Sequence, residues 1–160
     1  YIRLSQDWYK DFQINLSKKL KNKELSENNK IELVEKWEYF LSTIDSLFEE
    51  SKKKVDRDQN ELSFETFDGV KLNSTDLSAD EKQLIIILMS VLCSENKPFV
   101  LLLDEPEISL HVDWQHKLIE IIRTLNPNAQ LIIATHSPSM IMYGWMDKIT
   151  TMDEITKKSN

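Results

Sequence analysis

The strongest constraint on the fold of this chain is residues 99–106 (FVLLLDEP), an apolar run that ends in two adjacent acids and a proline. The five apolar residues have no alternating polar face, which is typical of a strand buried on both faces of a parallel sheet. Pro106 ends the strand because proline has no N–H to donate to a neighbouring strand. The sequence therefore predicts Asp104 and Glu105 at the carboxyl end of a central strand, where open α/β sheets bind ligands.

The two acids suggest two chemical roles at that sheet edge. Hard cations such as Mg²⁺ prefer carboxylate oxygens, and only one or two of them usually come from the protein. A second carboxylate beside the ion can position or deprotonate a water molecule. The alternative is that Asp104 and Glu105 simply begin a solvated turn.

A second strand follows after one helix. Residues 112–125 have helical apolar spacing and are followed by Asn126-Pro127-Asn128, which predicts a helix that stops at this turn. Residues 130–136 (QLIIATH) then form a second buried strand, so the segment is a βαβ unit with parallel strands. This topology puts His136 at the same sheet edge as Asp104 and Glu105. Residues 148–152 are predicted to form a final strand.

A helix start precedes the first of these strands. Ser78 and Glu81 have the Ser-x-x-Glu spacing of a capping box, and residues 84–89 (LIIILM) behind them are apolar almost all round, as in a buried helix. The free N–H groups and positive dipole end of such a helix start suit a phosphate group. The alternative is a plain helix cap with no ligand.

The amino-terminal part is predicted to be helical. Residues 4–21 carry one apolar stripe, Leu4, Trp8, Phe12, Leu16 and Leu20. A second helix carries a heptad seam of Val34, Trp37, Leu41, Ile44, Phe48 and Val55. We expect an antiparallel hairpin in residues 1–60 and a second unit in residues 61–160. Residues 62–67 and 70–72 flank Asp68-Gly69 and predict a β-hairpin.

Composition limits the classes of partner. The net charge is −7, and the acidic excess lies in residues 61–160, so the chain lacks the overall basic charge typical of nucleic-acid-binding domains. The lysines at 18–23 and 52–54 are weak candidates for DNA contacts. The single Cys93 excludes an internal disulfide and predicts a reduced, cytoplasmic compartment. No apolar run approaches the roughly 20 residues that span a bilayer, so no membrane partner is expected.

The order of these motifs resembles the carboxyl-terminal half of an ABC-type ATPase head over residues 62–155. Residues 77–83 (LSADEKQ) are similar to the ABC signature, 99–105 to a Walker B strand, 107–111 (EISLH) to the D-loop, and 134–138 (ATHSP) to the switch-histidine loop. The details resemble the SMC-like and OLD-family group, and most closely the ATPases of Septu-type and retron-associated antiphage systems. The resemblance implies an α/β fold, a partial P-loop ATPase head with a helical hairpin insertion.

The resemblance also implies roles for individual residues. Asp104 would hold Mg²⁺ through water, Glu105 would polarise the attacking water, and His136 would contact the γ-phosphate of ATP. The signature residues Ser78, Ala79 and Asp80 would bind the nucleotide of a partner head, with His111 at the D-loop position. The active unit would then be a homodimer of ATPase heads.

Two departures from the family pattern bear on activity. The family cradles phosphates with a Gly-x-x-x-x-Gly-Lys-Ser/Thr loop, whereas this chain has only Gly69 and Gly144, neither in such a loop. Together with the start at Tyr1, this predicts a fragment of a longer polypeptide that is inactive on its own. Asp80 also stands where the family signature has glycine, and its charge would be repelled by a triphosphate.

Three functions remain open from the sequence. The first is an ATPase that gates an effector in antiphage defence, such as an HNH-type nuclease or a retron reverse transcriptase with its non-coding RNA. The second is a scaffold that holds ATP with low turnover and binds protein or DNA, which Asp80 favours. The third is an SMC-like DNA-repair ATPase, which would need a longer coiled coil than residues 1–60 provide.

Overall fold

The computed structural model describes residues 2–22, 24, 26–59, 62–142 and 144–157, and the side chains of these residues except 2–9, 74 and 157. The helices are α1 (Ile2–Lys21), α2 (Glu27–Leu47), α3 (Ala79–Cys93), α4 (Val112–Leu125) and α5 (Met152–Lys157). The strands are β1 (Lys53–Val55), β2 (Phe64–Thr66), β3 (Lys71–Leu72), β4 (Phe99–Asp104) and β5 (Ala129–Ala134). Short 3₁₀ helices are η1 (Ser74–Asp76), η2 (Pro106–Ser109), η3 (Pro138–Met140) and η4 (Met146–Lys148).

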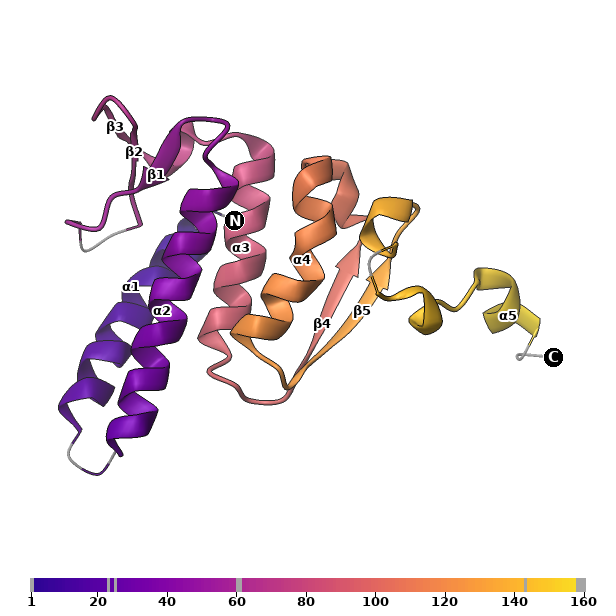
Figure 1. Ribbon diagram of the computed structural model, residues 1–160, viewed down its shortest axis with the longest axis horizontal. Helices are drawn as coiled ribbons and strands as arrows, with labels where there is room; N and C mark the ends of the chain where they lie inside the picture. The colour runs from indigo at the N-terminus through magenta and orange to yellow at the C-terminus, as the bar shows by residue number, and fades with distance from the viewer. Residues whose placement is uncertain (1, 23, 25, 60–61, 143, 158–160) are drawn as a thin grey trace.

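The predicted strand–helix–strand unit is confirmed. β4 and β5 pair in parallel, with α4 between them in sequence, and Asp104 lies opposite Ala134 in the register. The two strands therefore end together, and the residues that follow them share one sheet edge. In Figure 1 both strands point toward the upper edge of the molecule, where α3 and α4 begin.

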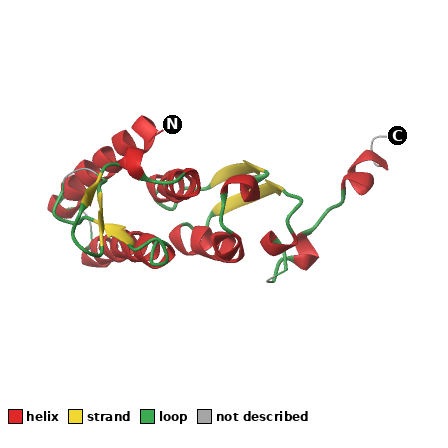
Figure 2. Ribbon diagram, turned by 90° about the horizontal axis from the view of Figure 1, so that it is seen from above, coloured by secondary structure: helices red, strands yellow, loops and turns green. Residues whose placement is uncertain are grey.

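The apolar helix α3 lies at the centre of the molecule. Eight of its 15 residues are buried, among them Leu84, Leu88 and Met89 at 0% exposure. Figure 2 shows α1 and α2 on one side of α3 and α4, and the β4–β5 sheet on the other. A helix that is apolar almost all round needs this cover on several sides, as its sequence predicts.

The two amino-terminal helices run in opposite directions side by side (Figure 1). The rings of Phe12 and Trp37 stack with centroids 5.2 Å apart, and Leu41 and Ile44 are buried as predicted. Val34, however, is exposed, and the predicted positions Leu4 and Trp8 lie outside the described side chains.

The pair does not project from the rest of the molecule, as an isolated hairpin would. Phe12 and Leu16 of α1 belong to the same hydrophobic cluster as the buried face of α3. The Lys19 ammonium also forms an ion pair with Glu95, just after α3. The apolar stripe of α1 therefore faces α3 as well as α2.

A small antiparallel sheet follows α2. β1 pairs with β2 and β2 with β3, and the Asp68-Gly69 turn of the predicted hairpin joins the last two. Val55 was expected to continue the helical seam, and this is wrong, because α2 ends at Leu47 and Val55 lies in β1. Phe64 of β2 fills the space beside the Phe48 ring, with centroids 5.8 Å apart, which places this sheet against the end of α2.

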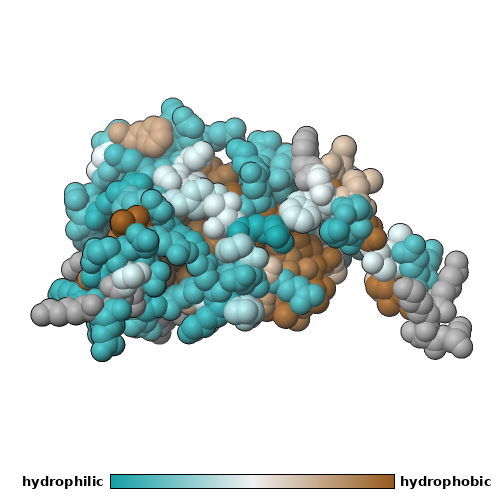
Figure 3. All heavy atoms as spheres, turned by 60° about the horizontal axis from the view of Figure 1, so that its bottom comes forward, coloured by the Kyte–Doolittle hydropathy of each residue, from teal (hydrophilic) through white to brown (hydrophobic). Residues whose placement is uncertain are grey.

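The β4–β5 sheet is covered on one face only. Leu102 is 70% exposed, and Val100 and Ile132 are each 52% exposed, because their side chains point away from α3 and α4. Figure 3 shows the apolar area at the position of this sheet, right of the centre. The prediction that residues 99–103 are buried on both faces is therefore wrong for the described chain. Because residues 99–103 are all apolar, the uncovered face of the sheet is an apolar surface.

The carboxyl-terminal segment also differs from its prediction. Residues 148–152 do not form a strand: η4 ends at Lys148, and α5 begins at Met152. Residues 148–152 are exposed and pair with no strand of the described chain. No described helix is both long enough and apolar enough to cross a membrane.

Replacing Ile44 with alanine should destabilise the protein strongly. Ile44 is at 0% exposure in the hydrophobic cluster, and removing a buried Ile side chain costs about 2–5 kcal/mol of unfolding free energy. Urea denaturation measures this loss. Ile31→Ala in the same helix is the matched control, because Ile31 is 53% exposed and its loss should cost under about 1 kcal/mol. Equal losses in the two variants would contradict the packing of α2.

Candidate functional site

The acidic pair lies at a sharp turn at the end of β4. Asp104 is the last residue of the strand and is exposed, and the Glu105 N–H still donates to the Ala134 carbonyl at 2.8 Å. Glu105 then adopts left-handed backbone angles, φ 44° and ψ 51°, and Pro106 begins η2. Non-glycine residues with positive φ are uncommon and often lie at functional sites. The turn re-aims the chain so that the two neighbouring carboxylates are presented at the sheet edge.

His136 follows the end of β5 and faces this turn. Its Nε2 atom lies 3.6 Å from a carboxylate oxygen of Glu105, and its side chain is 91% exposed. The structure thus brings together Glu105 and His136, which sequence and resemblance assigned to one site. An imidazole and a carboxylate at this separation can bind a polar ligand from two sides, one as donor and the other as acceptor.

A second layer of polar side chains supports this edge, and none of its members is among the predicted site residues. Glu107 in η2 accepts hydrogen bonds from the N–H groups of His136 at 2.6 Å and Ser137 at 3.1 Å. The buried Gln115 accepts from the Ser137 hydroxyl at 2.7 Å. In the sequence, Glu107 has two signals: it follows Glu105 by two residues, and it begins the D-loop-like segment 107–111. Gln115 has only its polarity on the inner face of α4.

The predicted helix cap before α3 is confirmed. The Ser78 hydroxyl accepts from the Glu81 N–H at 3.2 Å, and the Glu81 carboxylate accepts from the Ser78 N–H at 2.8 Å. Ala79 and Asp80 form the first turn of α3, with Ala79 exposed and Asp80 half-buried. The helix start is therefore well ordered and accessible, as a phosphate-binding end requires.

Glu81 does more than cap the helix. It is 2% exposed, and its carboxylate accepts from the Lys53 ammonium at 2.8 Å and from the Ser51 hydroxyl at 2.8 Å. Burial alone raises the pKa of Glu81, but the hydrogen bonds from Lys53, the Ser78 N–H and Ser51 outweigh it, so this pKa lies below its usual value. Glu81 therefore joins the start of α3 to β1 through buried contacts that the sequence spacing did not predict.

These contacts also change the interpretation of the lysine run at 52–54. Lys53 is paired with Glu81, and Lys54 with Glu65 at 2.9 Å. Two of the three ammonium groups are thus neutralised within the protein, which weakens this run as a candidate DNA contact.

The two parts of the predicted nucleotide site remain separate. The hydrogen bonds and ion pairs of the described residues do not join Ser78, Ala79 or Asp80 to the Glu105–His136 edge. In Figure 1 the start of α3 lies beyond the start of α4 from the end of β4, although both face the same upper edge. One chain alone therefore does not form a single closed pocket from these residues.

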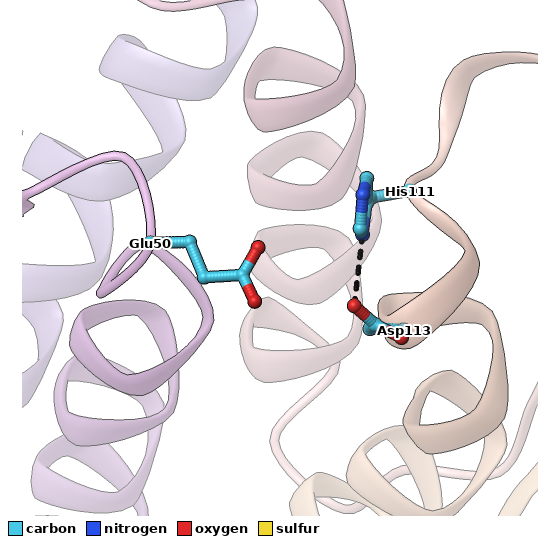
Figure 4. Close-up of side chains that lie close together, drawn as sticks. All are labelled: Glu50, His111 and Asp113. Atoms are coloured by element: carbon cyan, nitrogen blue, oxygen red, sulfur yellow. Dashed lines mark ion pairs between the residues drawn. The ribbon is translucent and has the colours of Figure 1, made fainter.

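His111 lies between these two parts, at the amino-terminal cap of α4. Its Nδ1 atom is 3.3 Å from Asp113, and Glu50, after α2, completes a group whose ligand atoms all lie within 4.8 Å of one another. Figure 4 shows the three side chains converging from two segments. One imidazole and two carboxylates are ligands that Zn²⁺ accepts, but all three are exposed, as acidic surface groups commonly are without an ion.

Trp114 fixes the position of that group. Its indole N–H donates to the Leu47 carbonyl at 3.1 Å, and its ring stacks on Phe48 with centroids 5.7 Å apart. The end of α2 and the start of α4 are therefore held together, which places His111 on a rigid support.

Comparison with known proteins agrees with these motifs. A family model described as "AAA domain, putative AbiEii toxin, Type IV TA system" matches residues 7–141. The chain belongs to this family of AAA-type ATPase domains. The match includes the acidic turn, His136 and the start of α3.

Three relatives are similar over parts of the chain. The Septu protein PtuA of Bacillus thuringiensis is 36% identical over 53 residues, which are 33% of this chain and 13% of PtuA. The "Retron Vc95 probable ATPase" of Vibrio cholerae serotype O1 biovar El Tor is 28% identical over 74 residues, 46% of this chain and 14% of the relative. The phosphate import ATP-binding protein PstB of Malacoplasma penetrans (strain HF-2) is 39% identical over 75 residues, 44% of this chain and 25% of PstB.

The predicted resemblance to ATPases of Septu-type and retron-associated systems is thus confirmed. The chain spans between 13% and 25% of the length of these relatives. Family and relatives together identify an ATPase-type domain that is similar to proteins of antiphage systems.

The Glu81 contacts predict a dependence of stability on pH. Because the folded-state pKa of Glu81 is lowered, its charged form stabilises the fold above the unfolded-state pKa of about 4.3. This contribution should be lost as the pH falls through the lower folded-state pKa. Glu81→Gln should cost roughly 3 kcal/mol of unfolding free energy at pH 7.

Urea denaturation of both proteins between pH 7 and pH 3 tests this dependence, and the difference between them should shrink below about pH 4.3. Glu120→Gln, at an exposed position on α4, is the control and should change stability by under about 0.5 kcal/mol. A difference that stays constant down to pH 3 would show that the Glu81 charge contributes nothing.

Proposed function

We propose that this chain is the carboxyl-terminal half of an ABC-type ATPase head that hydrolyses ATP and gates an effector in antiphage defence. The observation that carries the proposal is the Glu105 carboxylate 3.6 Å from His136, at the shared end of β4 and β5. Membership of the ATPase family and the similarity to PtuA and the retron ATPase support it.

Glu105 and His136 have complementary roles in this proposal. The Glu105 carboxylate accepts a hydrogen bond from the attacking water and polarises it, as a general base requires. The exposed His136 imidazole donates to the γ-phosphate, where negative charge must be stabilised. The turn at Glu105 keeps the attacking water and the γ-phosphate that His136 contacts at the same edge of the β4–β5 sheet.

Asp104 is proposed to hold Mg²⁺. Its carboxylate is an exposed oxygen donor next to Glu105, which fits the preference of this hard cation for few protein ligands and several waters. When bound, Mg²⁺ supplies positive charge that neutralises the phosphates. Asp104 would orient the nucleotide through it.

The phosphate-binding loop is proposed to lie outside these 160 residues. Neither Gly69 nor Gly144 stands in a Gly-x-x-x-x-Gly-Lys-Ser/Thr sequence, so this chain has no such loop of its own. The apolar face of the β4–β5 sheet supports the same proposal, because the heads of such ATPases need a covering layer. We therefore expect the 160-residue chain alone not to hydrolyse ATP.

The signature residues are proposed to act on a second head. Ser78, Ala79 and Asp80 lie apart from Glu105 in the chain, while their helix end is accessible. In a head-to-head homodimer this end would meet the γ-phosphate held by the partner, and His111 would lie at the interface. An HNH-type nuclease, or a retron reverse transcriptase with its RNA, is the proposed effector.

A scaffold of low turnover is the second candidate, and Asp80 favours it. A carboxylate in the first turn of α3 is stabilised by the helix dipole but repels an incoming phosphate. Such a protein would hold ATP and present a surface to protein or DNA. An SMC-like repair role is less well supported, since α1 and α2 have only 20 and 21 residues and pack on α3.

Glu105→Gln in the complete ATPase should keep Mg-ATP binding and slow hydrolysis by about 10²–10⁴-fold, because the amide cannot accept a proton from water. Steady-state turnover and nucleotide titration measure the two properties. Glu120→Gln is the control at an exposed carboxylate of α4 and should leave both unchanged. Unchanged turnover in Glu105→Gln would remove this residue from the mechanism.

Asp80→Gly should tighten ATP-dependent association of the heads and raise basal turnover. At about 6 Å and an effective dielectric constant of about 20, two unit charges repel by roughly 3 kcal/mol before screening by salt. The nucleotide-free protein should lose a few tenths to about 1 kcal/mol of stability, since a favourable charge leaves the helix start. Dimerisation and hydrolysis are measured side by side at low and moderate salt.

Asp80→Asn is the matched variant, because it removes the charge without adding a helix-breaking glycine. It should reproduce the gain in association. If neither variant changes association or turnover, Asp80 is only a helix-cap residue.

A further inference from the structure

We propose that Glu107 is the positioning residue of this site: its carboxylate sets the place of His136 relative to Glu105. The inference rests on the proposed ATPase function and deepens it. It starts from an observation on His136, whose side chain is 91% exposed and whose only close side-chain neighbour among the described contacts is Glu105. Packing therefore does not fix this imidazole, and its position depends on the backbone that carries it.

The backbone at His136 is held by one carboxylate oxygen. β5 ends at Ala134, and Oε1 of Glu107 accepts from the N–H groups of His136 at 2.6 Å and Ser137 at 3.1 Å. The Ser137 N–H is shared with the Thr135 hydroxyl oxygen at 3.0 Å, so among the described residues Glu107 is the single acceptor for the His136 N–H alone. Hydrogen bonds to a charged acceptor are roughly twice as strong as neutral ones. The Glu107 side chain thus takes the place of a strand partner for the His136 N–H and shares the Ser137 N–H with Thr135.

The second oxygen of Glu107 shows that the carboxylate is held there at a cost. Oε2 is buried and has no hydrogen-bond partner in the structure. Burial alone raises the pKa of Glu107, but hydrogen bonds from Thr135 and from the N–H groups of His136 and Ser137 lower it overall. Glu107 is half-buried, and the hydrogen bonds to its carboxylate from His136 and Ser137 both come from the loop after β5, so its place is explained by the need to hold that loop.

Gln115 closes the support from the other side. Its amide nitrogen donates to the Leu110 carbonyl at 2.8 Å, while its oxygen accepts from the Ser137 hydroxyl. The loop after β5 is therefore tied to η2 and α4 at the same time. Glu107 lies in η2, two residues after Glu105, which caps this 3₁₀ helix. A movement of η2 would therefore move both the Glu105 carboxylate and the loop that contains His136.

The first test measures hydrogen exchange of the His136 and Ser137 amides by NMR on the 160-residue chain whose structure is described here. Glu107→Ala should speed exchange at the His136 amide by about tenfold to a hundredfold, the range expected when a bond to a charged acceptor is lost. The Ser137 amide should change less, because it keeps the Thr135 hydroxyl oxygen as an acceptor. Glu107→Gln keeps one oxygen acceptor, so its exchange rates should lie between those of the wild type and Glu107→Ala. Ile108→Ala, at a 75% exposed position of the same 3₁₀ helix, is the matched control and should leave both amides protected.

The second test uses the complete ATPase and separates a positioning role from a merely structural one. Glu107→Ala should lower kcat and leave KM for ATP within about twofold, and Glu107→Gln should partly restore kcat. Glu120→Gln, at an exposed carboxylate of α4, is the control and should match the wild type in both constants.

The outcomes are distinguishable. Unchanged exchange at the two amides, or an equal rise across the whole chain, would overturn the positioning role whatever the activity. Local loss of amide protection with an unchanged kcat would also overturn the positioning role, because ATP turnover would then not depend on the position of His136. If the complete protein shows no turnover that depends on Glu105, the proposed function fails, whereas the exchange result still decides whether Glu107 holds the loop.

Discussion

Burial of α3 is the constraint on which the arrangement of the other elements depends. Residues 84–89 offer no polar face, so the helix can be stable only with apolar neighbours around it. The stripes of α1 and α2 cover it on one side, and α4 with the β4–β5 sheet covers it on the other. The start of α3 is then set by its cap and by the buried Glu81, so the same helix that fills the core also presents Ser78, Ala79 and Asp80 at the surface.

The candidate site follows from parallel pairing more than from local sequence. Two strands in register end at the same level, and the residues that follow them meet although they are far apart along the chain. The sequence alone therefore sufficed to predict that Glu105 and His136 lie close together. Glu107 and Gln115 could not, because their roles come from hydrogen bonds between loops, which have no period or spacing in the sequence.

The errors of prediction have two causes: hydropathy reports which residues are apolar but not which elements cover them, and it does not report where the backbone turns. Leu102 is as hydrophobic as a core residue, yet its side of the sheet is bare in the described chain. Val55 fits a heptad seam, but Lys52 has a positive φ of 54° and turns the chain from α2 into β1. The left-handed angles of Glu105 were also missed, because they arise from the turn into Pro106 and not from a glycine.

The open edges of the β4–β5 sheet determine where a further strand could be added to it. Each strand has one neighbour within the described chain, so its outer row of backbone N–H and C=O groups is open to hydrogen bonding. A strand from elsewhere can add to either edge without breaking any bond between β4 and β5. The ends of the strands, where Glu105 and His136 lie, and the open edges are thus different sides of one sheet. Growth of the sheet sideways leaves the ends of its strands, and the residues that follow them, where they already are.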